Sequence, residues 1–352
     1  MSDSTSAPDA NVIRVGTRKS PLAMAQAYLV VDALQAAFPS HTFPIDSMTT
    51  TGDRDQNTAL YNFGGKGLWT SQLEDKLVRN QVDIVVHSLK DMPTELPDGL
   101  VLGCVTKRGD PRDTLVVKKS LTEEHGWRTL ADLPAGSVVG TSSIRRIAQL
   151  ARRYPHLTFK DHRGNINTRL QKLEDDPALS AIILAAAGLQ RMAFGDRIAQ
   201  FLDGDSAGML HAVGQGALGI ECRAGDARVL AALEKLKDVP TTLACLAERS
   251  LMRSLEGGCS VPIGVETTWL ADGRLRLRAT VVSVKGDKAV DADEAEAITT
   301  EQAADEFGKR IARDLVAGGA DDILNAINAD KAAQAQQAEA AQAAQTTQAA
   351  QQ

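Results

Sequence analysis

Long hydrophobic runs, aromatic residues and excess positive charge are all scarce in this 352-residue sequence. No apolar stretch approaches the roughly 20 residues that a membrane-spanning helix needs. Residues 1–8 have neither the basic start nor the apolar centre of a signal peptide. Aromatic residues make up 4% of the chain and the net charge is −6, whereas nucleic-acid-binding proteins are typically basic and carry stacking aromatics. We therefore expect a cytoplasmic protein that binds neither membranes nor nucleic acid.

Metal-binding and phosphate-binding motifs are missing as well. The four cysteines, Cys104, Cys222, Cys245 and Cys259, include no C-x-x-C pair and no zinc-site spacing. We expect most of them to be buried thiols and predict no metal site. The phosphate loop G-x-x-x-x-G-K-[ST] and the fingerprint G-x-G-x-x-G are also absent. A phosphate-transferring enzyme is therefore the least favoured class.

Alternation of strand and helix patterns runs through the first two thirds of the chain. A strand over residues 12–15 leads into a loop in which Ser20 is placed to cap a helix that starts at Pro21. A strand over 43–48, glycine-bearing loops at 51–53 and 64–67, and a helix over 68–79 follow. This order predicts an α/β domain.

The stretch over residues 82–93 combines a buried strand with polar chemistry. Its first half is apolar and β-branched, which is typical of a strand buried in a parallel sheet. Ser88, Lys90 and Asp91 follow at once, and Pro93 ends regular structure. Because ligands bind where such strands end, we expect Lys90 and Asp91 at the mouth of a cleft. A solvated Lys-Asp turn is the alternative.

A second unit of similar design begins near residue 110. Residues 138–146 repeat the order of residues 15–20, in which a strand, Gly-Thr, a hydroxyl group and an arginine precede a helix. Two such units predict two similar domains, each with a helix N-terminus that can face an anion. The repeat is short, so chance similarity is the alternative.

Arginines recur beside Gly, Ser or Thr at expected strand ends and helix starts. They are Arg18, Arg145, Arg146, Arg163 and Arg169, with Arg191 as a sixth. Between residues 140 and 173 there are eight Lys or Arg residues and one acid, Asp161. Guanidinium groups bind carboxylates or phosphates with a planar fork, so together they predict a polyanionic small-molecule ligand. Taken singly, each could be a surface charge. Arg145 and Arg146 are adjacent, and we expect them to reach different acids.

The rest of the chain differs in kind. Glycines at 214–219 suit a crossing between domains. Helices over 227–236 and 241–255, an alternating strand over 274–284 and a helix over 301–316 predict a small α+β domain. Cys259 follows two glycines on an expected loop, where it could be structural or a point of covalent attachment. From about residue 330 the chain is almost entirely Ala and Gln, and we expect no fold there.

These motifs, in this order, closely resemble the porphobilinogen deaminase family. They are Gly-Thr-Arg18-Lys-Ser20-Pro, Gly-Gly-Lys66-Gly, His-Ser88-Leu-Lys90-Asp91-Met-Pro, Val-Gly-Thr-Ser142-Ser143-Ile-Arg145-Arg146, Arg163-Gly-Asn165, Arg169, Ala-Gly-Leu-Gln-Arg191, Val-Gly-Gln-Gly and Glu-Gly-Gly-Cys259. The resemblance covers roughly residues 12–328. It leaves out the leader, residues 1–11, a segment over 120–127 that looks inserted, and the tail, residues 329–352.

The resemblance implies a fold and an activity. It implies two similar periplasmic-binding-protein-like α/β domains, over residues 12–110 with 212–234 and over 111–211, and an α+β domain over 235–328. The active cleft would lie between the first two. A dipyrromethane cofactor would be joined to Cys259 by a thioether. Porphobilinogen, the expected partner, would be added in four steps with loss of ammonia. The monomeric transferase would then release hydroxymethylbilane by hydrolysis for tetrapyrrole and haem biosynthesis.

The resemblance also implies roles for individual residues. Asp91 would stabilise the cation that ammonia leaves behind, because a fixed carboxylate beside the pyrrole N–H opposes that charge. The carboxylates of substrate and cofactor would be held by Arg18, Ser20, Ser88, Lys90, Ser142, Ser143, Arg145, Arg146, Arg163, Asn165, Arg169 and Arg191. Lys66 would belong to a mobile lid. An anion-binding module without chemistry, similar to periplasmic solute-binding proteins, is the competing interpretation.

Overall fold

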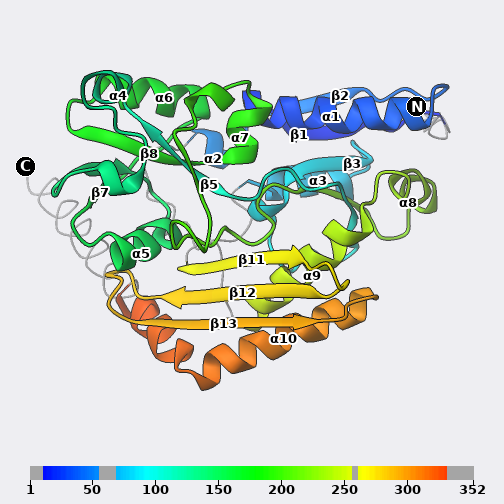
Figure 1. The fold of residues 1–352 in the computed structure, drawn as a ribbon. Helices are drawn as coiled ribbons and strands as arrows, with labels where there is room; N and C mark the ends of the chain where they lie inside the picture. Colours follow the sequence, from blue (N-terminus) through cyan, green and yellow to red (C-terminus); the bar gives the residue numbers. More distant parts are fainter. Residues whose placement is uncertain (1–10, 55–68, 256–260, 331–352) are drawn as a thin grey trace, which may run out of the picture.

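The computed structural model describes residues 11–54, 69–255 and 261–330, which form three sheets with helices packed on them (Figure 1). We call each sheet with its helices a lobe. The first sheet has the order β2-β1-β3-β10-β4. Its strands are β1 (Val15–Arg18), β2 (Ile45–Met48), β3 (Ile84–Ser88), β4 (Leu100–Val105) and β10 (Leu218–Arg223), and its helices are α1 (Pro21–Ala37), α2 (Thr51–Arg54), α3 (Ser71–Val78) and α8 (Ala227–Leu233).

The first lobe confirms the strand–helix alternation and corrects two details. The strand predicted over 12–15 lies three residues later, with only an isolated bridge between Val12 and Thr42 before it. β3 is buried as predicted, but its sheet is mixed rather than parallel. β10 returns from far along the chain and runs antiparallel to both β3 and β4.

The second sheet repeats the first in order and direction. It runs β7-β6-β8-β5-β9, with β6 parallel to β7 and β8 and with β5 antiparallel to β8 and β9. Its strands are β5 (Asp113–Val117), β6 (Val138–Gly140), β7 (Thr158–Lys160), β8 (Leu179–Ala185) and β9 (Gln200–Leu202), and its helices are α4 (Lys119–His125), α5 (Ile144–Arg153), α6 (Ile166–Asp175) and α7 (Ala186–Arg191). The predicted repeat is therefore structural: β1 and β6 hold the same place in their sheets.

Two crossing segments join these lobes. Residues 106–112 lead from β4 to β5, and residues 203–217 lead from β9 back to β10. The segments touch where the Gly109 N–H donates to Gly216 O at 3.1 Å. Gly216 has a φ of +88°, and a Cβ there would lie 2.6 Å from Gly109 O. Glycine is required at this close approach. The domain boundaries at residues 110, 211 and 234 stay predictions.

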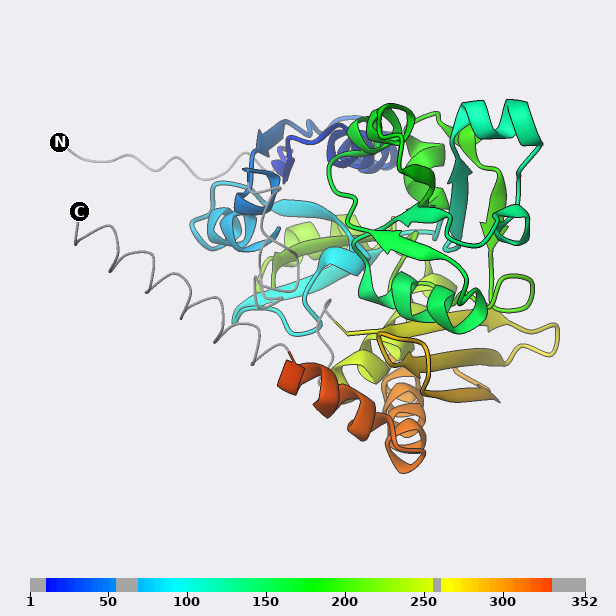
Figure 2. The same ribbon diagram turned by 90° about the vertical axis from the view of Figure 1, so that its left-hand side faces the viewer.

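The third lobe is the small α+β unit that the sequence predicted, except that the helix expected over 227–236 is α8 and packs on the first sheet. Its antiparallel sheet, β11 (Ile263–Trp269), β12 (Leu275–Val282) and β13 (Ala289–Glu296), packs against α9 (Val239–Ser254) and α10 (Glu301–Ala317) around an apolar core that includes Phe307. Figures 1 and 2 show this lobe beneath the other two. The buried Arg108–Glu248 ion pair, with Nη1 2.6 Å from Oε1, ties it to the first crossing segment.

None of the helices in the described ranges is both long enough and apolar enough to span a bilayer.

Candidate active site between the first two lobes

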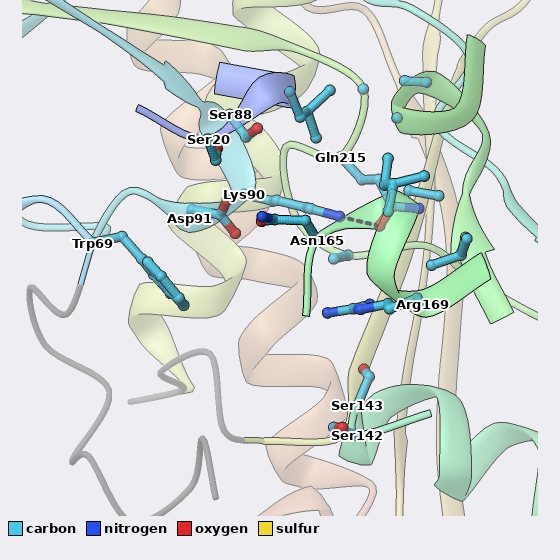
Figure 3. A pocket seen from close by; sticks show the side chains of 18 of the residues that line it. Ser20, Trp69, Ser88, Lys90, Asp91, Ser142, Ser143, Asn165, Arg169 and Gln215 are labelled. Carbon is cyan, nitrogen blue, oxygen red and sulfur yellow. Dashed lines mark hydrogen bonds between the residues drawn. The ribbon is translucent and has the colours of Figure 1, made fainter. Parts of the chain in front are cut away.

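A cavity of about 410 Å³ lies where the first two lobes face each other (Figure 3). All thirteen predicted site residues that fall within the described ranges line it. They are Arg18, Ser20, Ser88, Lys90, Asp91, Ser142, Ser143, Arg145, Arg146, Arg163, Asn165, Arg169 and Arg191. The other two predicted residues, Lys66 and Cys259, lie outside the described residues. The cavity therefore brings together side chains that are up to 173 positions apart, from Arg18 to Arg191.

The first lobe contributes two strand ends. Ser20 caps α1 by accepting the N–H of Ala23 at 3.4 Å, which places it and Arg18 at the cavity wall. β3 ends at Ser88, whose hydroxyl accepts a hydrogen bond from Gln26 Nε2 at 2.8 Å. A single 3-10 turn, Leu89–Asp91, then turns Lys90 and Asp91 into the cavity. This placement agrees with the predicted cleft mouth.

Lys90 reaches from this turn toward the second lobe. Its Nζ donates to Gln215 Oε1 at 3.3 Å, the hydrogen bond dashed in Figure 3. Burial lowers the pKa of Lys90 to about 8, even though neighbouring Asp91 opposes the shift. The lysine therefore carries a charge whose population changes close to neutral pH.

The second lobe contributes the N-terminus of α5. Arg145 and Arg146 were expected to reach different acids, but both bind Asp113 at the start of β5. Arg145 Nη1 lies 2.7 Å from Asp113 Oδ2, and Arg146 Nη2 lies 2.7 Å from Oδ1. The prediction was wrong because the two oxygens of one buried carboxylate, that of Asp113, bond both guanidinium groups. Their remaining N–H groups stay directed at neighbouring acceptors, among them Leu210 O and Ile183 O.

Asp113 is a buried counter-ion within this cluster. Burial alone would raise the pKa of its carboxyl group, but Arg145 and Arg146 outweigh that effect and hold the pKa well below its ordinary value. Two positive charges meet one negative charge here, so the cluster keeps a net positive charge beside the cavity. A buried charge is tolerated only when it is paired in this way.

The N-terminus of α6 contributes the remaining cations. Asn165 and Ser143 occupy the N-cap positions of α6 and α5, and neither side chain makes the capping hydrogen bond. Both residues line the cavity, so these helix N-termini lie at its wall, where helix N–H groups can bind an anion. Burial, with Arg146 and Arg163 nearby, lowers the pKa of Arg169 to about 10.

Arg191 ends α7 beside the crossing segments. Its Nη2 donates to Gly216 O at 2.6 Å, and burial lowers its pKa. The guanidinium group stays charged despite this shift, so it can bind an anion in the cavity.

Sequence reasoning missed four residues of this site. Asp113 binds the arginine pair, and Gln215 bonds both Asp113 and Lys90. Asp53 pairs with Arg18, and the ring centroid of Trp69 lies 4.1 Å from Arg18 Cζ. The aromatic side chain next to a glycine-rich stretch was one available signal for Trp69. The other three residues lie 32 to 125 sequence positions from the residues they contact, and no local pattern predicts such contacts.

The balance of charge defines what the cavity can bind. The described lining residues include seven cations, Arg18, Lys90, Arg145, Arg146, Arg163, Arg169 and Arg191, and two acids, Asp53 and Asp91. No group of His, Cys, Asp and Glu in the described ranges could hold a metal ion. The arrangement suits a ligand with several carboxylates. Within the described residues, no salt bridge joins Asp91 to an arginine.

Comparison with known proteins agrees with this chemistry. The family model "porphobilinogen deaminase, dipyromethane cofactor binding domain" matches residues 13–231, and the model of the porphobilinogen deaminase C-terminal domain matches residues 242–317. The porphobilinogen deaminase of Neurospora crassa is 50% identical over 317 residues, covering 90% of this chain and 94% of that protein. That of Yarrowia lipolytica is 51% identical, covering 89% and 92%.

A bacterial relative is equally similar. The porphobilinogen deaminase of Synechococcus elongatus is 50% identical and covers 90% of this chain and 96% of its own length. Among solved structures, the methionine binding protein MetQ aligns with a TM-score of 0.41 and 12% identity, over 66% of this chain and 93% of that one. From the two family models and these relatives, the chain belongs to the porphobilinogen deaminase family.

Proposed function

We propose that this chain is a porphobilinogen deaminase, also called hydroxymethylbilane synthase. It joins four porphobilinogen units head to tail with loss of ammonia and releases hydroxymethylbilane by hydrolysis. The observation that carries this proposal is the cavity in which seven cations from two lobes surround Asp91. An anion-binding module would explain the cations, but it gives Asp91 no task. A porphobilinogen deaminase needs both the cations and Asp91, and membership in the family favours this function.

The cations would bind the acid side chains of the substrate. Each porphobilinogen carries an acetate and a propionate group, so a growing chain of pyrroles is a row of carboxylates. Arginine binds a carboxylate through two parallel N–H donors. Arg18 on the first lobe and Arg163 and Arg169 on the second face the cavity from opposite sides. A pyrrole chain bound between the lobes would therefore have arginine donors for its carboxylates on both lobes.

The cavity also fits the dipyrromethane for which the matching family domain is described. The chemistry of the donor set, with guanidinium groups, hydroxyl groups and helix N–H groups, matches the carboxylates of two pyrroles. Arg145, Arg146 and Arg163, with Ser143 and Asn165, would hold it. When bound, it supplies the pyrrole carbon to which the first porphobilinogen is joined.

We propose a thioether between this cofactor and Cys259. A thiolate is the reactive form of cysteine. Burial raises the pKa of Cys104 to about 12, of Cys222 to about 11 and of Cys245 to about 12, so these thiols are protonated and poorly reactive at neutral pH. Cys259 is the remaining cysteine of the sequence. This reasoning supports Cys259 as the attachment point.

Asp91 would carry the chemistry. Loss of ammonia from the aminomethyl group of porphobilinogen leaves a cation delocalised over its pyrrole ring. A carboxylate fixed beside the ring N–H accepts that hydrogen bond and opposes the developing charge. The 3-10 turn and the buried Leu89 and Met92 on either side fix the position of Asp91. Lys90 would bind a substrate carboxylate next to it.

We propose that the enzyme works as a monomer. We further propose that the enzyme acts in the cytoplasm, that Lys66 belongs to a lid over the cavity, and that the domain boundaries lie near residues 110, 211 and 234. Light scattering of the purified protein tests the first of these points.

An intact mass of the purified protein tests the function. Protein made in cells that synthesise porphobilinogen should be heavier than its sequence by one dipyrromethane, and peptide mapping should place the added mass on Cys259. The Cys259→Ala variant should have no added mass and no activity, whereas Cys222→Ala, a buried control, should keep both. A wild-type mass equal to that of the bare chain would favour the anion-binding module.

A further inference from the structure

The side chain of Gln215 connects the two lobes at the centre of the cavity. Gln215 is 1% exposed and lies in the second crossing segment, residues 203–217. Its Nε2 donates to Pro111 O at 2.7 Å and to Asp113 Oδ1 at 3.0 Å. Its Oε1 accepts from Lys90 Nζ at 3.3 Å (Figure 3). One amide therefore joins the lysine of the first lobe to the buried carboxylate of the second.

The surroundings fix which way this amide points. Pro111 O and the carboxylate of Asp113 can only accept hydrogen bonds, so both N–H groups of Gln215 must face them. A flipped amide would set its oxygen against these two acceptors and its NH₂ group against the donor Lys90. The oxygen is therefore committed to Lys90 before any ligand binds. A committed acceptor favours the charged, three-donor form of lysine over the neutral amine.

Lys90 depends on such an acceptor because its other neighbours oppose one another. Asp91 on its own turn and Asp113 on β5 favour the charged form, while Arg145 and Arg146 on α5 disfavour it. Burial adds to the disfavouring side, and the pKa falls to about 8. The hydrogen bond to Gln215 Oε1 adds a fixed acceptor on the side of the charged form.

We infer that Gln215 is a positioning residue, which holds Lys90 against the arginine cluster of the second lobe and keeps it charged for a ligand carboxylate. The catalytic consequence rests on the proposed function, since it requires Lys90 to bind a carboxylate of porphobilinogen or of the growing chain. The hydrogen bond between Gln215 and Lys90 does not depend on the proposed function. Gln215 acts on Lys90 through a direct hydrogen bond, so its loss should alter how the enzyme responds to pH.

The titration of Lys90 can be measured directly. Trace acetylation of the full-length protein between pH 6 and pH 10, followed by peptide mass spectrometry, reports the fraction of Lys90 that is unprotonated. Gln215→Met keeps nearly the same volume and removes the acceptor. The midpoint for Lys90 should fall by about one to two pH units, as expected for loss of a hydrogen bond to a charged group. The alkaline limb of kcat/KM should move by the same amount.

Gln149→Met is a matched control. Gln149 is also buried (3% exposed) and hydrogen-bonds backbone atoms of Leu210 and Arg145, so the variant removes a comparable network but not the acceptor of Lys90 Nζ. Its Lys90 midpoint should stay at the wild-type value. An equal shift in both variants would show a general loosening of the lobes and overturn the inference, as would an unchanged midpoint in Gln215→Met.

A second variant covers the case in which Gln215→Met does not fold. Gln215→Asn keeps the amide but is one methylene shorter, so its oxygen no longer reaches Lys90 Nζ and the Lys90 midpoint should fall below that of the wild type. A midpoint that rises or stays unchanged would overturn the inference. If the wild-type protein forms no hydroxymethylbilane, the proposed function fails, but the labelling curve still decides whether Gln215 controls Lys90.

Discussion

Asp53 holds the guanidinium group of Arg18 at the cavity wall, with Arg18 Nε 3.2 Å from Asp53 Oδ2. Thr50 fixes the same carboxylate through its backbone N–H (3.1 Å) and its hydroxyl group (2.8 Å). The ring of Trp69 stacks on the guanidinium from another side. Asp53 thus occupies the position on Arg18 that a substrate carboxylate would take.

Replacing Asp53 with Asn should therefore strengthen substrate binding. The amide keeps the shape but competes less well for Arg18, so KM for porphobilinogen should fall by roughly tenfold, the lower range for one charge-assisted contact. Steady-state kinetics measure this. Asp46→Asn, which breaks a half-buried pair with Lys76 on the same lobe, should leave KM unchanged. A higher KM in Asp53→Asn would mean that Asp53 positions Arg18 for the substrate instead.

Asp91→Asn should separate chemistry from binding. The amide keeps the shape and one acceptor oxygen but loses the negative charge that opposes the cation. Removal of such a stabiliser typically slows the chemical step by about a hundred- to a thousandfold. The arginines still hold the carboxylates, so affinity should change much less. Rapid-mix single-turnover assays, with binding measured separately, test this.

Glu95→Gln is the control for Asp91. Glu95 is an exposed acid four residues later, so this variant should turn over like the wild type. If Asp91→Asn also reacts within about tenfold of the wild-type rate, Asp91 is a structural turn residue.

The arginines should act at different stages of chain growth. A lengthening chain of pyrroles needs new cationic partners, so Arg145→Leu, Arg146→Leu and Arg163→Leu should disturb cofactor assembly or the early additions. Arg169→Leu or Arg191→Leu should permit early steps and slow later ones. Each lost contact should weaken binding roughly ten- to a hundredfold. Native mass spectra that count the attached pyrroles measure the stage.

The control for this series is Arg153→Leu. Arg153 is an exposed arginine at the end of α5, outside the cavity lining. It should give the wild-type ladder of intermediates. Wild-type ladders in all the cavity variants would remove the role assigned to the arginines.

Asp113→Asn should cost stability. Without its charge, Arg145 and Arg146 are left as buried cations, and breaking such a cluster typically costs about 3–5 kcal/mol of unfolding free energy. Urea unfolding at pH 7 measures this. Asp305→Asn breaks a half-exposed pair with Arg253 and should cost less than about 1 kcal/mol. Equal losses would mean that the cluster is not a structural hub.

The same variant predicts a pH effect. The pKa of Asp113 is lower in the folded protein than in the unfolded chain. Its stabilisation is therefore complete above the unfolded value of about 3.9 and is lost as pH falls toward the folded value. The wild type should lose stability steeply below about pH 4, and Asp113→Asn should show a shallower decline over that window. An unchanged acid slope would exclude Asp113 as a source of the acid sensitivity.

The sequence predicted those parts of the molecule that local pattern determines. Ser20 at the start of α1 and the polar turn after β3 are local features, because capping and strand ends are marked by neighbouring residues. The partners of those residues are not local. Asp113 lies 32 positions from Arg145, and Gln215 lies 125 positions from Lys90. The antiparallel β10 was missed for the same reason, since nothing near residues 218–223 specifies which strand it will join.

The paired crossings also constrain the order in which the chain can be completed during synthesis. β10 lies between β3 and β4 in the first sheet, so β4 has no partner strand until residues 218–223 have been made. The strands of the second sheet, by contrast, all lie within residues 113–202. On a ribosome the middle of the chain can therefore finish folding while the N-terminal part is still waiting. A nascent chain stopped after residue 211 should have a protease-resistant second lobe and an unfinished first one.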